Sequence, residues 1–268
     1  MIKTSWNKVA GWYKKEVGER GNYYHQKVIL PNLLRLLNLK PGEKVIDLGC
    51  GQGVLGRAIP AEAEYTGVDA ATDLINEAKS LDKNLKHRYM VGDITEKLSI
   101  ADKFNKAVIL LTLQNLKRPF KAIENAKNLL KDNGRLFIVI NHPCFRIPKH
   151  GDWETDREKG VQWRKTDVYM SHLEIPIESS PFDKKDNQIT FSYHYPLSTY
   201  MEMLSDNGLV IEKIEEWVSD KKSEGGMAKI EDRARKEFPL FMALVAYQRQ
   251  GSLGRCRREK NLYARWLT

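Results

Sequence analysis

The sequence contains few cysteines and no long apolar run. Its three cysteines, Cys50, Cys144 and Cys256, are odd in number and widely spaced among 268 residues, so neither a disulfide framework nor a zinc site is indicated. No apolar stretch approaches the roughly 20 residues of a membrane-spanning helix. The first residues, Met1 to Trp6, lack the pattern of a signal peptide. We therefore expect a protein of the reducing cytoplasm, with no membrane partner and no bound metal.

The chain is basic, with a formal net charge of +9, which raises the hypothesis of nucleic-acid binding. The distribution of charge weakens this hypothesis, because residues 249–268 hold six Lys and Arg residues against a single Glu. This segment also includes the linker-like sequence Gly251 to Gly254. We interpret residues 249–268 as a basic tail that is disordered or appended, rather than as an RNA-binding arm.

The segment from Val45 to Gly53 is the most informative part of the chain. It begins as an apolar strand of the kind that is covered on both faces in a parallel sheet. Asp47 lies near the end of this strand, and Gly49, Gly51 and Gly53 follow at alternate positions. Glycines in this arrangement allow the backbone to turn sharply and a ligand to approach closely. The segment therefore predicts a site for a nucleotide-like cofactor.

Residues 51–56 also satisfy the G-x-G-x-x-G pattern of dinucleotide-binding folds. In those folds the first glycine directly follows the strand. Here that glycine is Gly49, and counting from it places Val54 where the third glycine is required. An NAD-dependent oxidoreductase is therefore a disfavoured alternative.

Two further predicted strands also end in an acidic residue. Residues 64–68 lead to Asp69, which lies 22 residues after Asp47 and is placed to accept hydrogen bonds from ribose hydroxyls. Residues 87–91 lead through Gly92 to Asp93. For Asp47 and Asp69, ligand binding is favoured over the ordinary role of Asp as a turn former. A fourth apolar strand, residues 105–111, is followed by Thr112 to Asn115.

The block from Asp47 to Gly53, with the three elements that follow it in order, resembles class I S-adenosylmethionine-dependent methyltransferases. The resemblance covers about residues 5–248, with specific motifs in 44–115. It implies S-adenosyl-L-methionine as the cofactor. In the family, an acid in the position of Asp93 meets the adenine amino group while its neighbour packs on the ring, and an N-terminal helix covers the methionine end. The cofactor-binding residues that it implies are Tyr13, His25, Asp47, Gly49, Gly51, Gly53, Asp69, Ala70, Asp93, Ile94, Leu111 and Gln114.

The order of predicted elements indicates an α/β fold. Two helices, 6–20 and 23–37, come first, and Pro31 should end or kink the second. Helices at 54–59, 72–80 and 119–131 then alternate with strands, the fifth of which spans 135–140. This alternation predicts a parallel sheet with right-handed crossovers. The resemblance implies a Rossmann-like sheet of seven strands, mostly parallel with an antiparallel last strand, and helices on both faces.

The pattern changes after residue 140. Segments 168–177 and 188–195 predict a hairpin-like insertion, which we interpret as a substrate lid at 141–195 because ligands bind at this edge of α/β sheets. A helix at 197–206 and strands at 209–218 and 240–248 complete the sheet. The domains expected are an N-terminal helical cap over the cofactor at 1–40, the methyltransferase domain at 41–248 and the basic tail at 249–268.

His142 and His194 are the predicted catalytic residues. A base is needed only when the acceptor must lose a proton. His142 directly follows the fifth strand, near the expected transfer cleft, and His194 lies in the predicted insertion. A third candidate base is His172, and Arg146 is a candidate partner for a carboxylate of the substrate.

The predicted function is methyl transfer to a small-molecule acceptor by in-line displacement. The Asn/Asp-Pro-Pro-Tyr/Phe motif of enzymes that methylate nucleic-acid amino groups is absent after the fourth strand, where Leu111 to Gln114 stand instead. A small molecule is therefore favoured over nucleic acid as the partner. An RNA or protein methyltransferase is the alternative enzyme, and a non-catalytic S-adenosylmethionine-binding module is the alternative of another class. The sequence leaves the oligomeric state open.

Overall fold

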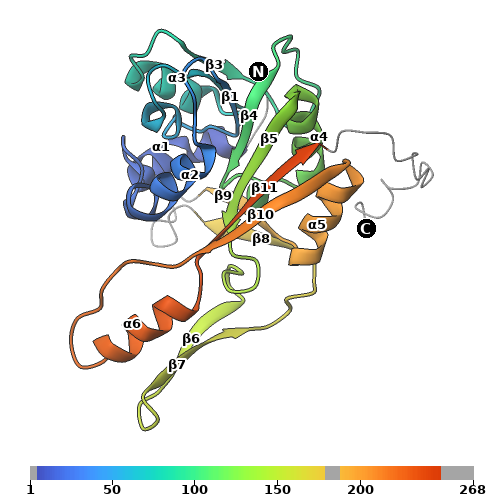
Figure 1. Ribbon diagram of the computed structural model, residues 1–268. Helices are drawn as coiled ribbons and strands as arrows, with labels where there is room; N and C mark the ends of the chain where they lie inside the picture. Colours follow the sequence, from blue (N-terminus) through green and yellow to red (C-terminus); the bar gives the residue numbers. More distant parts are fainter. Residues whose placement is uncertain (1–4, 179–187, 249–268) are drawn as a thin grey trace.

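The computed structural model describes residues 5–178 and 188–248, so the predicted basic tail and the tip of the predicted insertion lie outside the described residues. The chain forms a central seven-stranded sheet in the order β10-β11-β5-β4-β1-β2-β3, with helices on both faces (Figure 1). The strands are β1 (Lys44–Leu48), β2 (Glu64–Asp69), β3 (His87–Val91), β4 (Phe104–Leu110), β5 (Leu130–Asn141), β10 (Leu209–Trp217) and β11 (Phe241–Gln248). Within the described ranges, no helix is both long and apolar enough to cross a membrane.

The register confirms the predicted Rossmann-like architecture. Strands β3, β2, β1, β4 and β5 pair in parallel, whereas β11 is antiparallel to both β5 and β10. The carboxyl ends of the parallel strands therefore meet at one edge of the sheet. Because a crossover reverses direction beside β1, ligands are expected at this edge.

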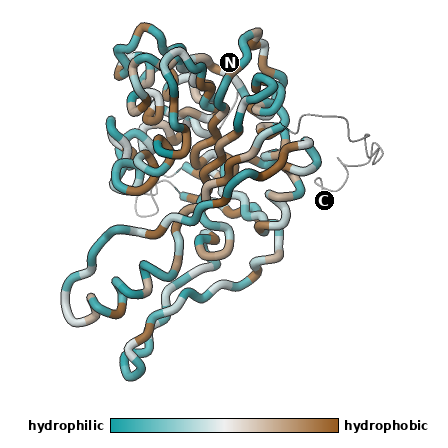
Figure 2. Tube along the Cα trace, in the orientation of Figure 1, coloured by the Kyte–Doolittle hydropathy of each residue, from teal (hydrophilic) through white to brown (hydrophobic). Residues whose placement is uncertain are grey.

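Alternating side chains of the strands build a core on each face of the sheet. Val45 and Val108 pack on one face with the N-terminal helices, and Ile46 and Ile109 pack on the other face with two later helices. Figure 2 shows the resulting concentration of apolar residues along the central strands. The period of two is what a sheet covered on both sides requires.

The helices follow the predicted order, with differences in extent. The helix predicted at 54–59 is only the 3-10 turn η2 (Gly56–Ala58), because Pro60 disfavours the helical conformation at Ile59, whose ψ is 158°. The helix predicted at 119–131 ends at Leu129, and β5 begins at the next residue, Leu130. The helix predicted at 23–37 is divided, as Pro31 suggested, into the π-turn η1 (His25–Ile29) and α2 (Leu30–Leu37). The other helices are α1 (Ser5–Val17), α3 (Thr72–Leu81), η3 (Leu113–Asn115), α4 (Pro119–Leu129), α5 (Leu197–Asp206) and α6 (Ala228–Glu237).

The segment at 141–195 forms two hairpins rather than one. The predicted hairpin is present as β8 (Leu173–Glu178) paired with β9 (Ile189–His194), and β9 contacts α1 and η3. The second hairpin, β6 (Gly151–Asp156) with β7 (Val161–Thr166), was not predicted. It packs against α6, and the two project together from the sheet (Figure 1).

We predict that Gly53→Ala destabilises the fold by about 2–4 kcal/mol, because two costs add. The φ of Gly53 is +76°, and a Cβ there would lie 2.7 Å from the Tyr89 hydroxyl. That hydroxyl cannot retreat easily, because it donates a hydrogen bond of 2.6 Å to Asp82. Urea unfolding would measure the loss.

Gly208→Ala is the matched control, because Gly208 has a φ of +70° and open space where a Cβ would stand. We expect it to cost about 1 kcal/mol, from backbone strain alone. Equal losses in the two variants would show that the close approach of Tyr89 does not constrain the loop.

Candidate active site

A cavity of about 650 Å³ lies at the carboxyl ends of β1, β2 and β4. It is lined by residues of α1, the glycine loop, and the segments that follow β2, β3 and β4. Every residue predicted to bind the cofactor lines this cavity, except Gly53. The structure therefore brings together side chains that lie as far apart in sequence as Tyr13 and Gln114.

The glycine loop gives the cavity its floor. Gly49, Gly51 and Gly53 all have positive φ, at 84°, 53° and 76°, a conformation that side-chain-bearing residues rarely adopt. A Cβ on Gly51 would lie 3.3 Å from the Tyr13 hydroxyl, and one on Gly49 would overlap Thr112. Gly53 differs from the other two, because it packs on a strand residue instead of lining the cavity.

Asp69 ties the glycine loop to the end of β2. One carboxylate oxygen accepts a hydrogen bond of 2.9 Å from the amide of Gly51, and the other accepts one of 2.8 Å from the amide of Ala71. Burial raises the pKa of Asp69, while these amides, with that of Ala70, lower it. Each carboxylate oxygen keeps a further lone pair, so Asp69 can still accept hydrogen bonds from a ligand hydroxyl.

Asp47 is a buried carboxylate with an incomplete set of partners. Its side chain is 1% exposed, and one oxygen accepts a hydrogen bond of 2.7 Å from the Tyr65 hydroxyl. The other oxygen, Oδ1, has no hydrogen-bond partner among the described residues. Burial raises the pKa of Asp47 to about 7, against the opposing effect of the Tyr65 hydrogen bond. A cationic group of a ligand would offset this desolvation cost.

The segment after β4 presents a second unsatisfied oxygen. Gln114 donates a hydrogen bond of 3.0 Å from Nε2 to the Leu111 carbonyl, and its Oε1 has no partner within the described ranges. Leu111 itself has a φ of +51°, which is a strained conformation for a residue with a side chain. Strain of this kind persists only where the surrounding structure holds it.

Two residues of the N-terminal helices cover the cavity. His25 lies 2.9 Å through Nδ1 from Asn22 Oδ1, and burial lowers its pKa to about 4. The imidazole is therefore neutral, with Nδ1–H donating to Asn22 and Nε2 left as an acceptor. Tyr13 packs edge-on against Trp6 at 5.8 Å, and burial raises the pKa of its hydroxyl.

Asp93 and Ile94 line the cavity at the turn that follows β3. Asp93 Oδ1 accepts hydrogen bonds from both the amide and the hydroxyl of Thr95, at 2.8 and 2.7 Å. These bonds fix the turn, as an Asp side chain commonly does. Its other oxygen, Oδ2, is left for a ligand.

His142 and His194 do not line the cavity. His142 Nε2 lies 2.6 Å from a carboxylate oxygen of Glu216, and its Nδ1 accepts from the amide of Cys144 at 3.2 Å. His194 Nε2 donates to the Tyr169 carbonyl at 2.8 Å. Burial lowers the pKa of both histidines. These contacts hold both imidazoles in place. The catalytic role of His142 and His194 stays a prediction.

Several cavity residues were not predicted. Trp12 and Glu16 project from α1, Asn22 precedes η1, and Lys117 and Arg118 follow η3. The only sequence signals were the aromatic clustering of the first helix and the break at Asn22. Neither signal indicates that these side chains face the same cavity as the glycine loop.

We predict that Asp69→Ala weakens the binding of S-adenosylhomocysteine by about 1–3 kcal/mol, through loss of hydrogen bonds to a charged acceptor. Isothermal titration calorimetry would measure the change. Asp73→Ala is the control, because Asp73 is an exposed acid in the first turn of α3. Affinity that is unchanged in the Asp69 variant would refute the ribose assignment.

The affinity for S-adenosylhomocysteine should also fall as the pH is lowered through about 7. Protonation of Asp47, whose pKa is about 7, removes the negative charge that attracts a ligand ammonium. We expect a loss of up to about 25-fold between pH 7.5 and 5.5, because the charged fraction of Asp47 falls about tenfold for each pH unit below its pKa. His25, with a pKa of about 4, stays neutral over this range. In Asp47→Asn the dependence should flatten, and an unaltered pH profile would contradict the role of Asp47.

Comparison with known proteins identifies the family. A family model described as "Methyltransferase domain" matches residues 39–189. The chain is 34% identical over 150 residues to a ubiquinone biosynthesis O-methyltransferase of Glaesserella parasuis, covering 52% of this chain and 59% of that protein. A protein of the same name from Coxiella burnetii is 33% identical over 108 residues, covering 39% and 46%. The chain thus spans about half the length of the curated relatives it matches.

Solved structures show the same fold. An S-adenosylmethionine-dependent methyltransferase of Mesorhizobium loti has a TM-score of 0.60 at 20% identity, covering 80% of this chain and 95% of its own. One from Clostridium acetobutylicum has a TM-score of 0.56 at 18% identity, covering 92% and 100%. Both the glycine loop and the strand-end acids lie inside residues 39–189, the segment that the family model matches. The chain belongs to the methyltransferase-domain family, with the fold of the class I S-adenosylmethionine-dependent methyltransferases.

Proposed function

We propose that this protein transfers the methyl group of S-adenosyl-L-methionine to a small-molecule acceptor by in-line displacement. The observation that supports this most directly is the convergence of three strand-end acids, Asp47, Asp69 and Asp93, on one cavity with the glycine loop. A buried Asp47 oxygen without a partner fits the ammonium of an amino acid. The carboxylate of Asp69, held by backbone amides, fits a pair of ribose hydroxyls.

The protein's main task in such a reaction is alignment. When bound, the cofactor supplies a methyl group that is already activated by its sulfonium. Asp47 and Gln114 would then hold the amino-acid end, while Asp93 and Ile94 would hold the base. Fixing both ends positions the reacting atoms, and alignment of this kind lowers the barrier by making the step effectively unimolecular.

Exclusion of water is the second task, and two elements are placed for it. Helix α1 and the β8–β9 hairpin contact each other, and β9 also contacts η3. Trp6 and Trp12 of α1 present aromatic surface to the cavity, which tolerates a cationic ligand. We therefore propose residues 1–40 as the cofactor cap and β8–β9 as the part of 141–195 that acts as the substrate lid.

The dimensions of the site favour a small acceptor. A cavity of about 650 Å³ lies within the range of roughly 300–1,000 Å³ that is typical of small-molecule sites. Similarity to proteins named ubiquinone biosynthesis O-methyltransferases supports the same class of acceptor. The runner-up, an RNA or protein methyltransferase, would draw on the basic segment 251–268.

Calorimetry and turnover test this proposal together. We expect S-adenosylhomocysteine to bind and NAD to show no binding, because the glycine register does not suit a pyrophosphate. Labelled S-adenosylmethionine should then transfer its methyl group to members of a panel of small hydroxylated aromatic compounds.

Three outcomes would contradict the proposal. Binding of NAD alone would end the methyltransferase assignment. Tight cofactor binding without turnover on any acceptor would indicate a binding module. Transfer to RNA or protein that is lost on removal of residues 251–268 would favour the runner-up.

A further inference from the structure

A group of cations and aromatic rings lies beside the cavity without lining it. It consists of Tyr23, Tyr24, Arg146, Lys221 and Phe241, which we call the rim cluster. The Arg146 guanidinium lies over the Phe241 ring at 5.1 Å, and the Lys221 ammonium lies 4.8 and 4.9 Å from the rings of Tyr23 and Tyr24. Tyr24 packs edge-on against both Tyr23 and Phe241. The two cations therefore pack on one continuous group of aromatic rings, in which Phe241 is buried and Tyr24 is half-buried.

Neither cation has an anionic partner in the part of the chain that the structure describes. Among residues 5–178 and 188–248, no carboxylate oxygen lies within 4.0 Å of the charged nitrogens of Arg146 or Lys221. Asp220, which precedes Lys221 in the sequence, interacts with the Tyr23 hydroxyl. Arg146 is half-buried, and burial lowers its pKa. A guanidinium with five donors in such a place is costly unless an acceptor meets it.

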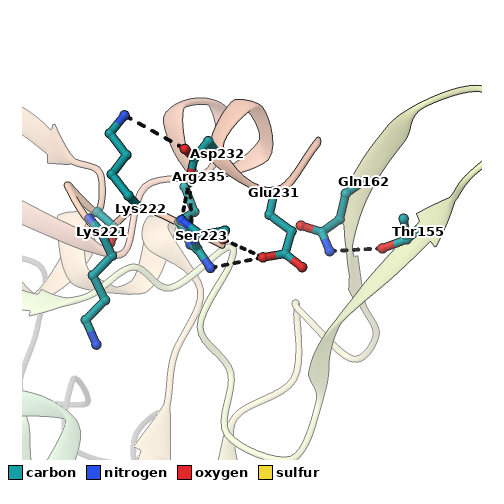
Figure 3. A network of polar contacts seen from close by, with 9 residues as sticks. Thr155, Gln162, Lys221, Lys222, Ser223, Glu231, Asp232 and Arg235 are labelled. Atoms are coloured by element: carbon teal, nitrogen blue, oxygen red, sulfur yellow. Dashed lines mark hydrogen bonds and ion pairs between the residues drawn. The ribbon is translucent and has the colours of Figure 1, made fainter. Parts of the chain in front are cut away.

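The neighbouring lysine shows the contrast. Lys222 pairs with Asp232, which belongs to a polar network of Ser223, Glu231 and Arg235 on and before α6. Figure 3 shows the Lys221 side chain directed away from this network, in the direction opposite to that of Lys222. Two adjacent lysines thus have different roles: one holds α6, and the other faces the rings of Tyr23 and Tyr24.

The rim cluster lies next to the cavity. Tyr24 directly precedes His25, which lines the cavity. Phe241 opens β11 and pairs with Asn141 at the carboxyl end of β5. In the sheet, β5 and β11 come next after β4, whose end lines the cavity. Two strand spacings, about 10 Å, therefore separate the end of β4 from the start of β11.

We propose that Arg146 and Lys221 bind an anionic group of the methyl acceptor, with the rest of an apolar or aromatic acceptor lying against the half-buried Tyr24 toward the cavity. This inference rests on the proposed function, and it narrows the substrate class to acids. Arg146 would supply the directional hydrogen bonds, because its planar fork matches an acid group. Lys221 is exposed and would add a weaker, salt-sensitive attraction. Arg164, bonded to the Phe145 carbonyl, adds positive charge near Arg146.

The test compares benzoate with benzamide on the protein saturated with S-adenosylhomocysteine, by ligand-observed NMR titration. The two probes differ in charge and share the ring, so only an anion site distinguishes them. We expect benzoate to bind more tightly than benzamide, with Arg146→Met weakening benzoate by about tenfold. Lys221→Met should weaken it by about two- to fivefold, and the matched control Lys222→Met should leave it unchanged. A phenyl phosphate arm then shows which acid group the site prefers.

Affinity for S-adenosylhomocysteine and the melting temperature of each variant are measured alongside. Retained cofactor binding shows that Arg146→Met is folded, and the exposed Lys221 variant provides a second reading that does not depend on the core. Equal binding of benzoate and benzamide, or benzoate binding unaffected by both substitutions, overturns the anion site and leaves the proposed function standing. Failure of S-adenosylhomocysteine to bind the unmodified protein overturns the proposed function itself.

Discussion

The close approach of three other elements to the glycine loop is the constraint on which the site depends. Gly49 faces Thr112 after β4, Gly51 faces Tyr13 of α1, and Gly53 faces Tyr89 of β3. At Gly49 and Gly53 a side chain occupies the space that a Cβ would need, and at Gly51 a Cβ would lie only 3.3 Å from the Tyr13 hydroxyl. Each glycine also has a positive φ. The absence of side chains therefore does more than admit a ligand. It allows a helix, a strand and a loop to converge on one turn, and this convergence encloses the cavity.

The two acids beside the loop meet the cost of desolvation in different ways. Asp69 accepts hydrogen bonds from backbone amides, which offset part of that cost. Asp47 has a single hydroxyl partner and an oxygen without one, and burial raises its pKa to about 7. A bound ammonium would supply what Asp47 lacks. Asp69 thus maintains the shape of the loop. Asp47, in contrast, has an unfavourable desolvation that ligand binding can relieve.

The sequence predicted the cofactor side of the site because its information is local. Parallel strands bring their carboxyl ends to one edge, so Asp47, Asp69 and Asp93 had to meet once each was assigned to a strand end. The tertiary contacts were not readable in this way. Trp12 lines the cavity only because α1 docks across the loop, and the β6–β7 hairpin has polar residues on both faces, which weakens the alternation that identifies strands. The helix predicted at 54–59 was wrong because the prediction followed the apolar pattern and did not include the short-range effect of Pro60 on Ile59.

The order of strands divides the carboxyl edge into two parts with separate demands. The part over β1, β2 and β4 is enclosed by the glycine loop and by strand-end acids. This set of groups suits the cofactor. The part over β5 and β11 is surrounded by the segments that interrupt the sheet, including the hairpins and α6, and its chemistry is cationic and aromatic. Since these segments connect at strand ends, they can vary without disturbing the register beneath them. If the proposed function holds, selectivity for the acceptor would therefore be set by the insertions, while the binding of the cofactor would depend on the core of the sheet.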